Sequence, residues 1–165
     1  MRLILGGVAF AATTSVLRPM NAFAKEALEK LVLGNDEWKK RLTGAQYNIL
    51  REEGTERPYS SALLSEKRAG VFACVACDLP LFESKTKFES GTGWPSFYDV
   101  IADHVETSVD YKLMAPRTEY HCARCGGHHG HVFEDGPEPT GLRYCNNGAV
   151  LTFIPATSTE EDHHG

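Results

Sequence analysis

Five cysteines carry most of the reactive chemistry in this sequence, and their spacing separates four of them from the fifth. Cys74 and Cys77 form one CxxC pair, Cys122 and Cys125 form a second, and 44 residues lie between the pairs. Each CxxC turn brings two sulfurs close enough to bind one ion, and two turns complete the tetrahedral site typical of structural zinc. The alternative is two disulfides, although a bond within CxxC is more often redox-active than structural. The sequence therefore predicts one structural zinc ion held by these four cysteines.

Cys145, in the stretch GLRYCNNGAVLTF, is the cysteine left over. If this stretch is a strand, Arg143, Cys145 and Asn147 share one face, because side chains alternate along a strand. Tyr144 and Asn146 then point to the other face. A guanidinium beside a thiol favours the thiolate, which is the nucleophilic form. The alternative is a buried structural cysteine, but the arginine would then be buried with it, so we expect Cys145 to be reactive.

Two further stretches supply side chains suited to such a site. HHGHVF places His128, His129 and His131 just after the second CxxC pair, and an imidazole titrates close to neutral pH, which suits proton delivery. SGTGWPSF places Trp94 among glycines and a proline, where a partly exposed indole can form a wall for a small apolar group. The alternatives are histidines with a structural role and a tryptophan in the core.

The N-terminal part of the chain, before these candidate site residues, is expected to be helical. Residues 25–58 are predicted to be helical, with Asn35 or Asp36 as one N-cap and Thr43 and Gln46 as a capping box. Gly54 and Pro58 then end the helical part of the chain.

Short strands are expected to follow Pro58. Stretches rich in β-forming residues are separated by Gly, Pro and Asp, namely GVFAC, TKFES, SFYDVI, HVETSVDY, TEYHC, GHVFED, LRYCN and AVLTFI. Strands at this spacing predict an antiparallel sheet or a small barrel.

The two ends of the chain differ from its middle. Residues 1–24 have one early arginine, an apolar run of 15 residues and a final AFA, a pattern that indicates a cleaved secretory signal. An uncleaved anchor and an organelle transit peptide are the alternatives. We expect residues 25–158 to form one domain, residues 159–165 to be a disordered tail, and the mature protein to be exported to a bacterial periplasm without a membrane segment.

Composition limits the classes of partner. The chain has 165 residues and a formal net charge of −5, and its pI is near 5.8. Nucleic-acid binders normally carry a basic face, so a nucleic-acid partner is not expected.

The motifs taken together resemble one known family. WKKRL, ERPYS, the first CxxC, GTGWPSFYDV, RTEYHCARC, HxGHVFEDGP and RYCNN occur in this order between Trp38 and Pro155. Their order and sequence are similar to those of the B-type methionine sulfoxide reductases, enzymes that reduce methionine-R-sulfoxide in proteins. The resemblance implies a mainly β fold of two antiparallel sheets with N-terminal helices and a structural zinc site.

The resemblance also implies roles for individual residues. Cys145 would be the nucleophile, with Arg143 and Asn147 as the flanking residues of the family's RxCxN motif. His128 and His131 would belong to the active site, and Trp94 would hold the methyl group of the sulfoxide. A thiolate attacks the sulfoxide sulfur, so Cys145 would become a sulfenic acid that a thiol must reduce.

The chain departs from a common form of the family at Thr92. Many members carry a second cysteine there, which resolves the sulfenic acid, and this chain has threonine. We therefore expect the single-cysteine type, reduced by a thioredoxin-like protein. The competing hypotheses are a zinc-ribbon-like binding module and a thiol peroxidase that uses the same cysteine.

Overall fold

The computed structural model describes residues 28–157. The predicted signal, residues 1–24, and the predicted tail, residues 159–165, lie outside the described residues, and both remain predictions. Within the described residues, no helix combines the length and the apolar character needed to cross a bilayer.

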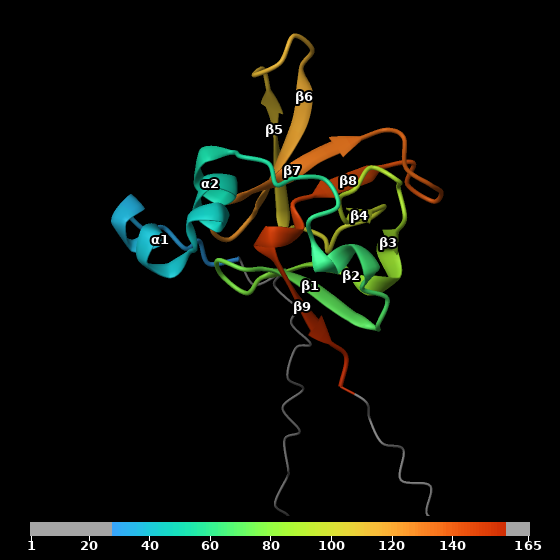
Figure 1. The fold of residues 1–165 in the computed structure, drawn as a ribbon, viewed down its shortest axis with the longest axis horizontal. Helices are drawn as coiled ribbons and strands as arrows, with labels where there is room; N and C mark the ends of the chain where they lie inside the picture. The colour runs from blue at the N-terminus through green and yellow to red at the C-terminus, as the bar shows by residue number, and fades with distance from the viewer. Residues whose placement is uncertain (1–27, 158–165) are drawn as a thin grey trace, which may run out of the picture.

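Two α-helices precede the strands (Figure 1). α1 spans Asn35–Arg41 and α2 spans Gly44–Glu52. The predicted capping box at α2 is confirmed, because Gln46 N donates to the Thr43 hydroxyl and Thr43 N donates to Gln46 Oε1. These bonds satisfy backbone donors that the first turn of a helix leaves free.

The start of the helical region was predicted incorrectly. The N-cap of α1 is Gly34, one residue before the expected Asn35 or Asp36, and it makes no side-chain capping bond. Asp36 lies in the first turn instead, where a carboxylate interacts favourably with the helix dipole. Residues 28–34 are not helical, so the helices are shorter than predicted.

Nine strands are described after the helices, joined by turns and three short 3₁₀ helices. The strands are β1 Gly70–Cys74, β2 Pro80–Glu83, β3 Lys87–Phe88, β4 Ser96–Phe97, β5 Val105–Asp110, β6 Arg117–Cys122, β7 His128–Phe133, β8 Arg143–Asn146 and β9 Leu151–Pro155. The 3₁₀ helices are η1 Ala62–Ser65, η2 Ser84–Thr86 and η3 Gly148–Val150. Each predicted strand overlaps one of these nine, but β2 was missed because it begins with a proline. Proline is tolerated at the first position of an edge strand.

The strands form two antiparallel sheets, as predicted. One sheet has the order β2-β1-β9 and the other has the order β3-β4-β8-β7-β6-β5. The small sheet and the large sheet pack against each other, with β9 leading away at the bottom of Figure 1 and the β5–β6 hairpin projecting at the top.

Aromatic rings fill the space between the sheets. Phe82 of the small sheet stacks on Phe97 of the large sheet, with ring centroids 4.2 Å apart, and Phe72 meets Phe97 edge-on at 5.0 Å. All three rings are fully buried, as is Tyr120 from β6. This core fixes the face of the large sheet that points away from solvent, and so decides which side chains of β6, β7 and β8 stay accessible.

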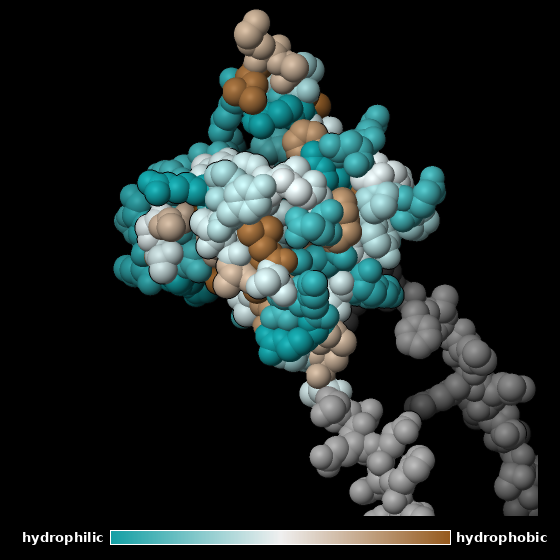
Figure 2. Space-filling model, turned by 45° about the vertical axis from the view of Figure 1, so that its right-hand side comes forward, coloured by the Kyte–Doolittle hydropathy of each residue, from teal (hydrophilic) through white to brown (hydrophobic). Residues whose placement is uncertain are grey.

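Exposed apolar side chains gather on the β5–β6 hairpin. Four of the seven large hydrophobic residues exposed in the described chain are Val109, Tyr111, Leu113 and Met114. The projecting tip in Figure 2 is correspondingly tan and brown above a largely hydrophilic body. Residues 111–116, at the turn of this hairpin, are all exposed, so no other described element covers them.

Candidate active site

Cys145 lies in β8, between two neighbouring strands of the large sheet. Its Cα pairs with His131 in β7 on one side and with Ser96 in β4 on the other. Directly opposed residues in an antiparallel pair point to the same face. The register therefore sets the His131 ring beside the Cys145 thiol, although the two residues are 14 positions apart.

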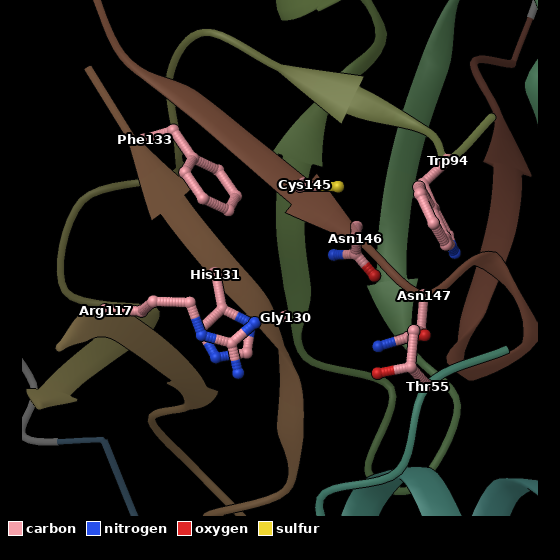
Figure 3. A pocket seen from close by; sticks show the side chains of 9 residues that line it. All are labelled: Thr55, Trp94, Arg117, Gly130, His131, Phe133, Cys145, Asn146 and Asn147. Atoms are coloured by element: carbon pink, nitrogen blue, oxygen red, sulfur yellow. The ribbon is translucent and has the colours of Figure 1, made fainter. Parts of the chain in front are cut away.

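The same face of the sheet is hollowed into a pocket of about 150 Å³. A cavity of this order accommodates a benzene-sized group. Figure 3 shows Cys145 near its centre, with Trp94 and Phe133 seen on opposite sides. The lining residues are Thr55, Trp94, Arg117, Gly130, His131, Phe133, Cys145, Asn146 and Asn147.

Trp94 is held in place from outside the sheet. Its indole Nε1 donates to the Glu56 carbonyl at 3.2 Å, and its ring stays partly exposed toward the pocket. Glu56 also accepts the backbone N–H groups of Gly148 and Ala149 through its carboxylate, at 2.5 and 3.0 Å. The segment after α2 thus ties the tryptophan wall to the chain that follows Cys145, which makes one side of the pocket rigid.

Two adjacent asparagines also line the pocket, and Asn147 lies on the same side as Trp94 (Figure 3). Asn147 lines it as predicted, but β8 ends at Asn146, so strand alternation no longer applies. The Asn147 side chain accepts from Glu56 N at 2.9 Å and donates to the His129 carbonyl at 3.0 Å. Asn146 was expected to point away from Cys145, and the register agrees, because Asn146, Gly130 and Tyr120 oppose one another across β8, β7 and β6 and the Tyr120 ring is buried in the core.

His131 is the predicted histidine that reaches the pocket. Its Nε2 lies 2.8 Å from Asp110 Oδ2, and the same carboxylate oxygen accepts from Arg117 at 2.5 Å. The backbone N–H of Lys112, followed by His131 and Arg117, holds the pKa of Asp110 below its usual range. Asp110 is therefore a carboxylate that orients the imidazole.

His128 is not among the residues that line the pocket. Its ring packs against the His131 ring, with centroids 5.5 Å apart, and its Nδ1 hydrogen-bonds to the buried Glu119 carboxylate. Burial is the main cause that lowers the pKa of His128. The structure therefore places His128 behind His131, while His129 is fully buried against Tyr120.

Arg143 lies beside the pocket and contacts it indirectly. It donates two hydrogen bonds to Asp135, at 2.7 and 2.9 Å, and its guanidinium lies over the Phe133 ring at 4.3 Å. Its charge lowers the pKa of Cys145, as the sequence predicted, and a hydrogen bond from Thr92 acts in the same direction. Burial of the thiol is the larger effect, however, and the pKa of Cys145 is raised overall.

The four CxxC cysteines come together at a separate place. All five cysteines are free thiols, and the ligand atoms of these four lie within 4.8 Å of one another. The Cys74 and Cys125 sulfurs are 3.7 Å apart, and those of Cys77 and Cys122 are 3.4 Å apart. A zinc tetrahedron with bonds of about 2.3 Å needs sulfurs about 3.8 Å apart. The donor set and its spacing therefore fit a metal site.

Tight turns shape both halves of this cluster. The backbone N–H groups of Cys77 and Asp78 donate hydrogen bonds to the Cys74 carbonyl, and the Gly126 N–H donates to the Cys122 carbonyl. Asp78 and Gly126 both have positive φ, at 58° and 67°, which the turn after each pair requires. Hydrogen bonds from Cys125 and then Cys74 lower the pKa of Cys122, and the thiolate is the form of cysteine that binds a metal.

Several residues of the site were not predicted from the sequence. Glu56 acts through partners more than 90 positions away. Asp110, Arg117 and Glu119 act through partners within or between neighbouring strands, and no local pattern marks any of the four. Asp135 lies within the GHVFED stretch, two residues after Phe133, and its closeness to Arg143 was the one available signal.

Comparison with known proteins decides the family. The SelR domain family matches residues 42–155. The chain belongs to the B-type methionine sulfoxide reductases. It is 54% identical over 140 residues to the peptide methionine sulfoxide reductase MsrB of Methanosarcina barkeri, covering 84% of this chain and 94% of that protein.

Other relatives agree with this assignment. The chain is 51% identical over 137 residues to MsrB of Methanosarcina mazei, covering 82% of this chain and 98% of that protein. It is 48% identical over 150 residues to the chloroplastic peptide methionine sulfoxide reductase B1 of Arabidopsis thaliana, covering 90% of this chain and 74% of that protein. The protein is therefore a peptide-methionine (R)-S-oxide reductase, an oxidoreductase whose substrates are oxidised proteins that carry methionine sulfoxide.

Proposed function

We propose that the reductase works through a sulfenic acid on Cys145. The observation that supports this most directly is the register of β7 and β8, which sets His131 opposite Cys145 on the face of the pocket. The Cys145 thiolate attacks the sulfoxide sulfur, and the oxygen passes to the cysteine. The cysteine is oxidised to Cys–SOH as the sulfoxide is reduced to methionine, so atoms and electrons balance.

His131 is proposed as the acid for this step. The sulfoxide oxygen must be protonated before the sulfur–oxygen bond can break, and the hydrogen bond to Asp110 holds the His131 imidazole in position to deliver the proton. His128 is proposed to support the position of His131, because the two rings pack against each other. Asn147 and Arg143 hold the two ends of the RxCxN segment through Glu56 and Asp135.

Trp94 is proposed as the wall that receives the methyl group of the substrate. Its ring borders the pocket near Cys145, and its indole N–H is already bonded to the Glu56 carbonyl. The ring thus presents an apolar face with no unpaired donor, which suits a methyl group better than a polar one.

The reaction is proposed to be of the single-cysteine type. Thr92 contacts the thiol, and the other four cysteines are grouped with one another. An external thiol would attack the sulfenic acid, form a mixed disulfide and release water, and a second thiol would free Cys145. A thioredoxin-like protein has the dithiol that both steps need.

Zinc is proposed as the ion held by Cys74, Cys77, Cys122 and Cys125. Four thiolates form a closed shell with no position for substrate, so the ion would stabilise the fold and take no part in catalysis.

We also propose that the protein is exported to a periplasm and loses residues 1–24. Mass spectrometry of the mature protein then finds an N-terminus near Lys25, and an intact Met1 on a cytoplasmic protein would contradict the proposal.

Turnover of dabsylated methionine-R-sulfoxide and methionine-S-sulfoxide with dithiothreitol tests the proposed function. We expect turnover of the R form alone, and Cys145→Ser should lose at least about a hundredfold in kcat/KM, since removal of a nucleophile costs orders of magnitude. Zinc content and circular dichroism of the variant serve as controls for folding. Undiminished turnover by Cys145→Ser would exclude Cys145 as the nucleophile. Faster turnover of hydrogen peroxide than of either sulfoxide would favour a thiol peroxidase.

A further inference from the structure

A second cluster of metal-binding side chains lies outside the pocket and outside the four-cysteine site. Glu119 and His121 are in β6, and His128 pairs with His121 from β7. Glu119 Oε1 lies 3.0 Å from His121 Nε2 and also hydrogen-bonds to His128 Nδ1. One ligand atom from each of the three residues lies within 4.8 Å of the other two.

This donor set is typical of sites for divalent transition metals. Two imidazole nitrogens and one carboxylate oxygen suit zinc, nickel or cobalt, with water in the remaining positions. An imidazole must be neutral to bind a metal, and burial lowers the pKa of His128. Glu119 and His128 are almost fully buried, at 6% and 2% exposed, so the two strands hold these donors in place.

The cluster is open to solvent on one side. The His121 side chain is 22% exposed, and Glu119 and His121 line an open hollow together with Glu53, Ser108 and Lys112. An ion with bonds of about 2.0–2.1 Å needs ligand atoms about 3.3 Å apart. The ring of His121 is the most exposed of the three side chains, so it is the one with most freedom to adjust to an ion.

We propose that Glu119, His121 and His128 bind one divalent transition-metal ion and that the bound ion slows the reductase. The His128 ring packs against the His131 ring at 5.5 Å. An ion on His128 Nδ1 therefore holds the His128 ring in place and restricts the movement of the His131 ring that packs against it, which proton delivery beside Cys145 needs. The effect on rate rests on the proposed acid role of His131, whereas the binding site itself does not.

Zinc binding can be measured on the full chain with its four-cysteine site loaded. The background is the double variant His163→Ala, His164→Ala, which removes the adjacent histidines of the C-terminal tail as competing ligands. Equilibrium dialysis against zinc, followed by elemental analysis, should give two ions per chain in this background. Adding His121→Ala should give one, and adding His104→Gln, a histidine outside the cluster, should again give two.

Rates are best compared in a single turnover without reductant, because dithiothreitol itself binds zinc. Methionine release in the background should slow at least about fivefold when the second ion binds and recover after dialysis against nitrilotriacetate. With His121→Ala, the rates with and without added zinc should agree within about twofold.

The alternative outcomes test the two parts of the proposal, the metal site and its effect on the rate, separately. A second ion that persists in His121→Ala but disappears in Cys145→Ser would place the ion at the reactive thiol and refute the site. Absence of a second ion in the background would refute it as well. A His121-dependent ion that leaves methionine release unchanged would refute the effect on rate while the proposed reductase mechanism stands.

Discussion

The reactivity of Cys145 depends on a balance between burial and polar neighbours. Burial favours the neutral thiol, while the charge of Arg143 and the hydroxyl of Thr92 favour the thiolate. The net result is a raised pKa, so the neutral thiol is favoured. The two polar neighbours should therefore control how fast the thiol reacts.

Replacement of Arg143 tests this balance. In Arg143→Met the charge that lowers the pKa of Cys145 is absent, so the pKa rises further and the thiolate fraction at pH 7 falls. Each unit of pKa changes that fraction about tenfold, and we expect inactivation by iodoacetamide at pH 7 to slow by about three- to tenfold. The rate should recover at high pH, where both proteins are ionised. Arg41→Met, at an exposed arginine of α1, is the matched control, and equal pH profiles for all three proteins would contradict the role of Arg143.

Thr92 supports a second prediction at the level of single residues. Thr92→Cys should form a disulfide with Cys145 after one equivalent of methionine sulfoxide, since the two side chains contact and a disulfide needs Cβ atoms about 4 Å apart. The wild-type protein should instead stop as a sulfenic acid that dimedone traps. Ser108→Cys, on an exposed strand position, should behave as the wild type does. Peptide mapping that found a wild-type disulfide between Cys145 and a CxxC cysteine would rule out the single-cysteine type.

The pairing of β7 with β8 is the element that assembles the site. Gly130 in β7 has so little space that an added Cβ would lie 1.9 Å from the Cys145 carbonyl oxygen. A side chain at this position must push the two strands apart. The absence of a side chain at Gly130 therefore allows the close approach that brings His131 to Cys145.

Gly130→Ala should accordingly reduce both stability and activity. Overpacking of this kind costs about 1–3 kcal/mol in the free energy of unfolding, and separation of His131 from Cys145 should lower kcat more than tenfold. Gly44→Ala is the matched control, because a Cβ there meets no atom within 4 Å and alanine favours a helix by about 1 kcal/mol. Chemical denaturation and steady-state kinetics measure the two effects. A Gly130→Ala protein with normal kcat would show that the spacing of these strands is not critical.

The four cysteines connect the two halves of the whole molecule. Cys74 and Cys77 belong to the β1–β2 turn of the small sheet, and Cys122 and Cys125 belong to the β6–β7 turn of the large sheet. A metal bound by all four links the sheets, and β7 continues from this turn to His131. The proposed zinc therefore helps to fix the position of His131 in the active site, although it lies outside the pocket.

Loss of one cysteine ligand should lower the stability of the whole protein. Metal binding in structural zinc sites provides about 10–16 kcal/mol of apparent free energy, so Cys77→Ser should lose its zinc and unfold at a much lower temperature than the wild type. Cys145→Ser, the one cysteine variant outside the cluster, should keep one zinc per chain and its melting temperature. Elemental analysis and thermal unfolding followed by circular dichroism give both values. A Cys77→Ser protein as stable as the wild type would be incompatible with a structural metal.

The sequence by itself determined the features that depend on local pattern. The CxxC spacing predicted the four-cysteine cluster, the Thr43 and Gln46 pair predicted the start of α2, and β-rich stretches separated by Gly, Pro and Asp predicted most of the strands. These signals are readable because turns, caps and strand faces depend on residues only a few positions apart. The motifs around Trp94 and Cys145 also sufficed for the family.

Only the tertiary structure decided how the site is built around Cys145. Asn147 bonds to Glu56 across 91 positions, and His131 bonds to Asp110 across 21 positions, and no local pattern encodes such pairs. The direction of the Asn147 side chain follows from the turn into η3, because β8 and its alternation end at Asn146. The raised pKa of Cys145 likewise follows from burial, because desolvation depends on every segment that packs around the thiol and not on the arginine two residues away.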